Sequence, residues 1–137
     1  MPFEELEHTA DVKMRISGTG LDGLLQESGF ALSRVLYGAY PNEPCTQTCE
    51  ITATGDSLEG LCVNFLSELL FLFETEYLVP MRFSLQVSAT AVEGTVSGVP
   101  FDRRKHAGGI GVKGISYSGL SLTQTNTEYE LIIIFDI

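Results

Sequence analysis

Tyr129-Glu130-Leu131-Ile132-Ile133-Ile134-Phe135-Asp136-Ile137 is the stretch that decides the fold. Six of its nine residues are large and apolar, and four of those six are isoleucine. Such a run favours a strand that is buried on both faces, which is the environment of an interior strand of a sheet. We therefore expect residues 128–135 to form the central strand of the sheet.

The end of this stretch gathers negative charge. Asp136 is followed by Ile137, the last residue of the sequence, so a side-chain carboxylate and the terminal carboxylate are expected side by side. Two negative charges this close need a counter-charge, and a hard cation with oxygen ligands is the usual one. The sequence therefore predicts a divalent-cation site at the end of the strand.

The composition is that of one acidic domain, residues 1–137. Eight basic and eighteen acidic residues give a formal charge of -10. This charge opposes nonspecific binding to nucleic acid or to an anionic membrane, so any RNA contact has to be local. With no secretory leader, no membrane span and an odd number of cysteines, three, we expect a soluble cytoplasmic protein.

Hydrophobic periodicity predicts two long helices and about seven strands. The helices begin near Thr19 and Asp56, each with an acidic residue three positions later as in a capping box. The strands are expected at 12–17, 48–54, 81–87, 95–101, 110–117, 120–124 and 128–135, with turns at Glu93-Gly94 and near Asn126. This order predicts an α+β domain in which the helices pack on one face of a mostly antiparallel sheet.

A short internal similarity suggests duplication. Leu58-Glu59-Gly60-Leu61-Cys62 resembles Leu21-Asp22-Gly23-Leu24-Leu25, and both segments open a predicted helix. The sequence is therefore compatible with two copies of a strand-to-helix unit.

Several catalytic or ligand motifs are incomplete. Gly109–Gly114 matches the glycine spacing of a dinucleotide-binding fingerprint. That motif needs a helix directly after it, whereas a strand is expected here. Gly114–Ser118 lacks the final glycine of a nucleophile elbow. Cys45 and Cys49 lack the second ligand pair of a zinc site. The basic segment 102–109 is either a solvated turn or a contact for an acidic partner or a phosphate.

Four features together resemble the archease family. They are Glu7-His8-Thr9-Ala10-Asp11 before the first strand, Phe65-Leu66-Ser67-Glu68-Leu69-Leu70 in the second helix, the strand from Lys113 to Tyr117, and the ending Phe135-Asp136-Ile137. The resemblance implies a protein that is not an enzyme itself. It implies an activator of the GTP-dependent RNA ligase of tRNA splicing and RNA repair, which promotes guanylylation and repeated turnover of that ligase.

The resemblance also implies roles for individual residues. It makes Asp11, Asp136 and the Ile137 terminus a metal site for calcium, with manganese or magnesium as alternatives, and it places His8 and Lys113 at the contact with the ligase. No stable binding to nucleic acid or membrane is expected. Gly111, Gly114 and Ser118 depart from the family pattern around Lys113. The alternative function is a chaperone-like modulator of tRNA-modifying enzymes such as a tRNA methyltransferase.

Overall fold

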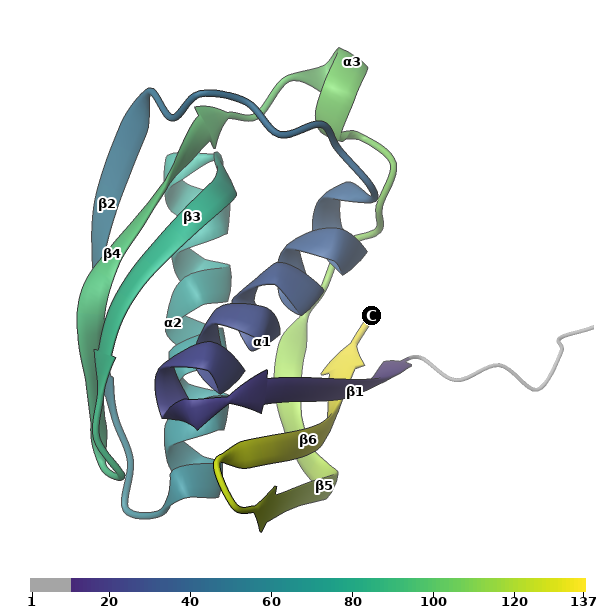
Figure 1. Ribbon diagram of the computed structural model, residues 1–137. Helices are drawn as coiled ribbons and strands as arrows, with labels where there is room; N and C mark the ends of the chain where they lie inside the picture. The colour runs from purple at the N-terminus through teal and green to yellow at the C-terminus, as the bar shows by residue number, and fades with distance from the viewer. Residues whose placement is uncertain (1–10) are drawn as a thin grey trace, which may run out of the picture.

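The computed structural model describes residues 11–137 and arranges them in two sheets and three helices (Figure 1). The elements are β1 (Asp11–Thr19), α1 (Gly20–Tyr37), β2 (Gln47–Thr54), α2 (Leu58–Glu76), β3 (Leu78–Val87), β4 (Ala91–Pro100), α3 (Arg103–His106), β5 (Gly114–Thr125) and β6 (Glu128–Asp136). The predicted α+β class is confirmed. Within residues 11–137, no helix is long and apolar enough to cross a membrane.

The strands form two antiparallel sheets of three strands each, so the predicted single sheet of about seven strands is wrong. The strand orders are β1-β6-β5 and β2-β4-β3. Two predicted strands, 110–117 and 120–124, merge into β5, whose register with β6 shifts between Ser116 and Ser121. Gly119 within this shift has a φ of 70°. Because glycine adopts positive φ readily, the strand bulges here without ending.

β6 is the middle strand of the first sheet, as predicted. Leu131, Ile133 and Phe135 are completely buried on one face. Ile132 and Ile134 on the opposite face are only half-buried. The predicted burial therefore holds for one face, and the other face of this sheet meets solvent.

The two long helices lie between the sheets, so the prediction that they cover one face of a single sheet is wrong. α1 packs against β1 and β6 of the first sheet and β3 of the second, and α2 packs against β5 and β2. In Figure 1 the second sheet is on the left, the first is at the lower right, and the helices are between them. Leucines and Phe65 from the helices fill this interior, and burying each such side chain contributes roughly 1.5–3 kcal/mol.

Both sheets are built in the same way. In each, a strand that leads into a long helix pairs with the second strand of a later hairpin. The turns into the helices also match, because a Cβ atom on Gly18 would collide with the backbone of Leu24, and one on Gly55 with that of Leu61. Only glycine permits such a close approach. The predicted strand-to-helix repeat is therefore present in the architecture.

Both predicted capping boxes are wrong in detail. Thr19 is the N-cap of α1, but its hydroxyl donates to a carboxylate oxygen of Glu128 at 2.5 Å and caps no helix N–H group. The N-cap of α2 is Ser57 and not Asp56, and its hydroxyl accepts a hydrogen bond from the N–H of Gly60 at 3.0 Å. A serine hydroxyl and an aspartate carboxylate are equally good caps, so the sequence alone did not separate them.

The hairpin of β3 and β4 turns at residues 88–90, so the predicted turn at Glu93-Gly94 is wrong. Gly94 lies inside β4, where a Cβ atom would overlap the carbonyl oxygen of Ser84 on the neighbouring strand. The glycine there serves close strand contact and not a turn. The predicted turn near Asn126 is confirmed, and Asn126 has the positive φ of 58° that such turns require.

Candidate metal site at the paired strand ends

The predicted site residues at the two ends of the sequence meet in the first sheet. β1 and β6 are adjacent and antiparallel, and their register places Asp11 directly opposite Asp136. The same register places Gly114 of β5 on the other side of Asp136. Asp11 is half-buried and Asp136 is exposed. Two carboxylates from distant parts of the chain therefore lie together at one end of the first sheet, next to a glycine.

The sheet fixes the direction of the Asp136 side chain. Successive residues of a strand point to opposite faces, and the preceding Phe135 is completely buried. Asp136 therefore points away from the core. A Cβ atom placed on Gly114 would lie 4.0 Å from Oδ2 of Asp136, so this carboxylate extends over the glycine. The absence of a side chain at 114 leaves the carboxylate accessible from that side.

Lys113 and Ile137 belong to the same edge. The main-chain N–H of Lys113 donates a hydrogen bond to the carbonyl oxygen of Asp136 at 2.7 Å, and the Lys113 side chain is exposed. Ile137 is half-buried and packs against the core. We call Asp11, Lys113, Asp136 and Ile137 the acidic tip. His8, the other predicted contact residue, lies outside the described residues.

The ligand chemistry of the acidic tip fits a hard divalent cation. Side chains directly opposite each other in an antiparallel pair have Cβ atoms about 4.5–5.5 Å apart, which allows two carboxylates to reach one ion. Among residues 11–137, no group of three or more His, Cys, Asp or Glu side chains could hold a metal ion. Ile137 follows Asp136 directly, so its terminal carboxylate is a candidate for a third ligand at the tip.

The segment Gly109–Gly114, which has the letters of a dinucleotide fingerprint, leads into β5 and not into a helix. The strand expected after it is confirmed. The motif therefore lacks the helix N-terminus that would receive a pyrophosphate.

A second polar cluster lies at α3, where the sequence predicted only a loop. The Nδ1 atom of His106 accepts the main-chain N–H of Asp102 at 2.9 Å, and its Nε2 lies 3.1 Å from Oε2 of Glu43. Because Nδ1 accepts a hydrogen bond, Nε2 carries the proton and donates to Glu43. Lys105 Nζ donates to Oε1 of the same glutamate at 2.9 Å. These bonds hold α3 against the loop that follows α1.

The charges of this cluster shift one another's pKa. The hydrogen bond from Lys105 lowers the pKa of the Glu43 carboxyl, burial opposes that effect, and His106 adds to it. The same bond raises the pKa of Lys105. Sequence patterns do not reveal this cluster, because Glu43 and His106 lie far apart in the chain and neither belongs to a motif.

Comparison with known proteins places the chain in a family. The model of the Archease protein family (MTH1598/TM1083) matches residues 3–137. The chain belongs to the archease family. It is 36% identical to a Drosophila melanogaster protein named archease-like over 100% of this chain and 91% of that protein. It is 28% identical to the archease of Methanosarcina acetivorans over 98% of this chain and 95% of that protein.

Solved archease-like structures share the fold. The solution structure of Methanobacterium thermoautotrophicum protein 1598 covers 96% of both chains with a TM-score of 0.80 at 18% identity. The crystal structure of a Thermotoga maritima archease, described as a possible chaperone, covers 98% of this chain and 97% of that chain with a TM-score of 0.68 at 19% identity. The resemblance predicted from the sequence is thus confirmed, whereas the metal and partner-contact roles of the acidic tip stay predictions.

Proposed function

We propose that this archease-family protein is a non-enzymatic activator of a GTP-dependent RNA ligase in tRNA splicing and RNA repair. It promotes guanylylation of the ligase and so allows repeated turnover. The acidic tip enters the ligase active site, where Asp11, Asp136 and the Ile137 carboxylate hold a divalent cation. Calcium is the first choice for this cation, and manganese and magnesium are alternatives.

The pairing of Asp11 with Asp136 at one end of the first sheet, where Asp136 is exposed, is the observation that carries this proposal. A divalent cation held there would neutralise negative charge that develops on phosphate oxygens during guanylyl transfer. The contribution of this chain is to position the cation. The tip ends the central strand β6, and the buried Phe135 anchors that strand in the core.

Lys113 has a separate role in the proposal. Its main chain is bonded to Asp136, and its side chain is exposed at the same edge. We assign its ammonium group, together with His8, to the contact with the ligase. An ammonium group beside the two carboxylates reduces their repulsion of the phosphate oxygens of GTP bound in the ligase.

The test is RNA ligation with limiting ligase from the same source, measured as product formed per ligase molecule. The native chain raises this yield, and Asp11→Ala and Asp136→Ala do not. Asp22→Ala is the matched control, because Asp22 is an exposed carboxylate on α1. Adding one residue after Ile137 also lowers the yield if the terminal carboxylate is a ligand. Full activity of both tip variants would refute the proposal.

A second candidate function is a chaperone-like modulator of tRNA-modifying enzymes such as a tRNA methyltransferase. The description of the Thermotoga maritima archease as a possible chaperone favours it. In this case the effect on the enzyme is independent of metal, and Asp136→Ala acts like the native chain. Methylation assays with and without a chelator separate the two functions.

A further inference from the structure

One end of the molecule exposes two aromatic side chains. Tyr77, the residue after α2, is 66% exposed, and Phe101, after β4, is 39% exposed. The N–H of Phe101 donates to the carbonyl oxygen of Tyr77 at 2.8 Å, so the two residues continue the pairing of β3 with β4. Their positions are therefore coupled through the main chain.

The backbone of Tyr77 is in a conformation that disfavours a tyrosine. It ends α2 with φ 54° and ψ 37°, in the left-handed region. Glycine or asparagine is the usual residue at this position of a helix end, because a bulky side chain is strained there. A large aromatic ring that is mostly exposed gains little from burial to offset the strain. A contact between the ring and a ligand explains why a tyrosine occupies this position.

Phe101 is held in place by its neighbours. Its ring packs on Tyr37 and His106 at centroid distances of 5.8 and 6.1 Å. The Tyr37 hydroxyl in turn donates to the carbonyl oxygen of Leu78 at 3.0 Å. Because the supporting groups are buried and hydrogen-bonded, the exposed part of Phe101 is a preorganised surface.

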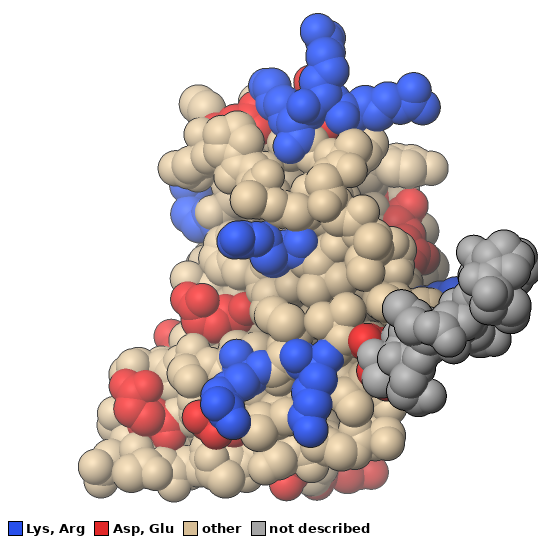
Figure 2. Space-filling view, turned by 90° about the vertical axis from the view of Figure 1, so that its right-hand side faces the viewer, with Lys and Arg blue, Asp and Glu red and all other residues tan. Residues whose placement is uncertain are grey.

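Cations lie beside Phe101. Arg103, Arg104 and Lys105 follow one another on α3, and the side chain of Arg104 is 93% exposed. A shallow hollow of about 620 Å³ would accept several atoms of a ligand, and its lining includes Phe101, Arg103 and Arg104 together with the acidic Glu43 and Asp102. Figure 2 shows blue side chains clustered at the top, at the level of α3 in Figure 1.

We infer that this end of the molecule, formed by Tyr77, Phe101, Arg103 and Arg104, binds single-stranded RNA. Aromatic rings on which bases stack, next to cations that contact phosphates, are the two components of single-strand recognition. An acidic peptide would use the cations but would not need exposed rings on a strained backbone. The choice of RNA rests on the proposed function, since the ligase acts on RNA.

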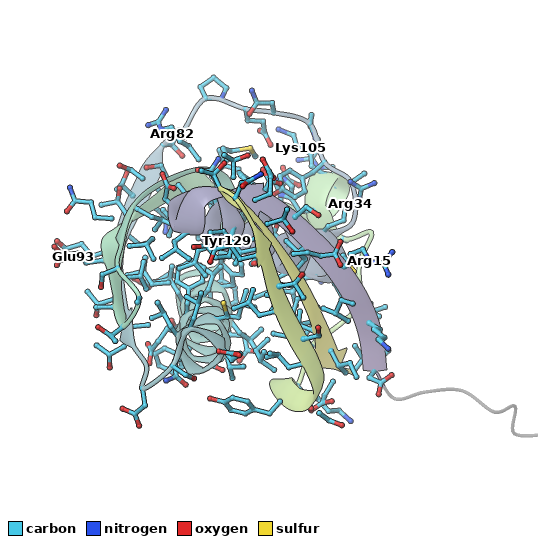
Figure 3. All side chains as sticks on the ribbon, turned by 60° about the horizontal axis from the view of Figure 1, so that its bottom comes forward. Arg15, Arg34, Arg82, Glu93, Lys105 and Tyr129 are labelled. Carbon is cyan, nitrogen blue, oxygen red and sulfur yellow. The ribbon has the colours of Figure 1, made fainter. Side chains whose placement is uncertain are left out.

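The inferred contact is local and weak, because the whole chain carries a charge of -10. It adds to the affinity of a complex in which the ligase holds the rest of the strand. Figure 3 shows Lys105 and Arg34 toward one side of the molecule, and Arg82 and Glu93 toward the other.

The first test measures binding of a fluorescent, unstructured RNA of about ten nucleotides to the isolated chain by anisotropy. Two phosphate contacts, from Arg103 and Arg104, predict that the logarithm of the affinity falls with the logarithm of salt with a slope of about -1.4, which is roughly 7-fold between about 50 and 200 mM. The double variant Arg103→Gln, Arg104→Gln removes both contacts, so its remaining binding should lose this dependence on salt. Lys13→Gln, Arg15→Gln is the matched control on β1, and it keeps the native slope.

The second test separates binding from folding. Tyr77→Gly relieves the left-handed backbone, so this variant melts no lower than the native chain, but it loses a stacking surface and binds RNA at least about five-fold more weakly. Native affinity in this variant, or no salt-dependent binding by the native chain, overturns the inference. If the double variant Arg103→Gln, Arg104→Gln weakens binding to the ligase but not to RNA, the inference of an RNA surface is overturned in favour of a protein contact.

A failure of this inference can be distinguished from a failure of the proposed function. Asp136→Ala binds RNA with native affinity, because the acidic tip is not part of the inferred surface. Loss of ligase activation with intact RNA binding therefore tests the tip, and loss of RNA binding with an intact tip tests the surface at α3.

Discussion

Asp136→Asn removes one of the two paired charges at the acidic tip with little change in size. Asp136 is exposed and lies opposite Asp11 in the β1–β6 register. Like charges directly opposite each other destabilise an antiparallel pair by roughly 0.2–1 kcal/mol. In a chelator, we therefore expect the variant to be as stable as the native chain or more stable by up to that amount.

With a divalent cation present, we expect the native chain to be more stable than Asp136→Asn. An ion that binds only the folded chain stabilises it by about 2.7 kcal/mol at about a hundred times its dissociation constant. With an unfolding entropy of about 2.1 cal/mol/K per residue, this raises the melting temperature of a chain of this length by roughly 10 °C. The variant has lost one carboxylate ligand and should show only a small part of that rise.

The assay is thermal unfolding of the native chain and of Asp136→Asn, each in a chelator and in calcium, manganese or magnesium. Asp22→Asn on α1 is the control for a lost surface carboxylate, and it should keep the full cation effect. The proposed cation site is refuted if no cation shifts the melting temperature of the native chain, or if the melting temperature of Asp136→Asn rises as much as that of the native chain.

Three further predictions concern stability and reactivity. Phe135→Ala should lower the free energy of unfolding by about 3–5 kcal/mol in urea denaturation, whereas Phe71→Ala, at a ring that is 64% exposed, should change it by less than about 0.5 kcal/mol. Burial raises the pKa of the Cys62 thiol to about 12, so thiol titration at pH 8 should modify Cys62 only after unfolding; modification at the rate of an exposed thiol would contradict this. The lowered pKa of Glu43 means that its bond to Lys105 stabilises the fold at neutral pH, and this contribution should be lost as the pH falls below about 4; a Lys105→Gln variant should lack that part of the acid dependence, and an unchanged profile would count against it.

The fold class was predictable from periodicity, but the division into two sheets was not. The pattern in residues 129–137 correctly indicated a central strand, because six large apolar residues in nine need an interior position. Periodicity is local, however, and it does not reveal which strands pair. Gly18 lies against Leu24, and Gly55 lies against Leu61 at the same spacing in the sequence. This repeated spacing indicates two matching strand-to-helix units, one in each sheet.

The acidic tip was predictable in composition but not in geometry. The sequence placed Asp136 next to Ile137, but it could not show that β1 lies beside β6. The cluster of Glu43, Lys105 and His106 was not predictable, because its bonds join a loop to a four-residue helix across the chain. Tyr77 was missed for another reason, since its backbone conformation appears only in three dimensions.

The most direct measurement of the proposed function is the transfer of labelled guanylate from GTP to the ligase, with the native chain, Asp136→Asn or Asp22→Asn added in catalytic amounts. We predict that the native chain and Asp22→Asn increase the amount of guanylylated ligase and that Asp136→Asn does not. An equal increase with Asp136→Asn, or no increase with the native chain, would contradict the claim that the acidic tip activates the ligase.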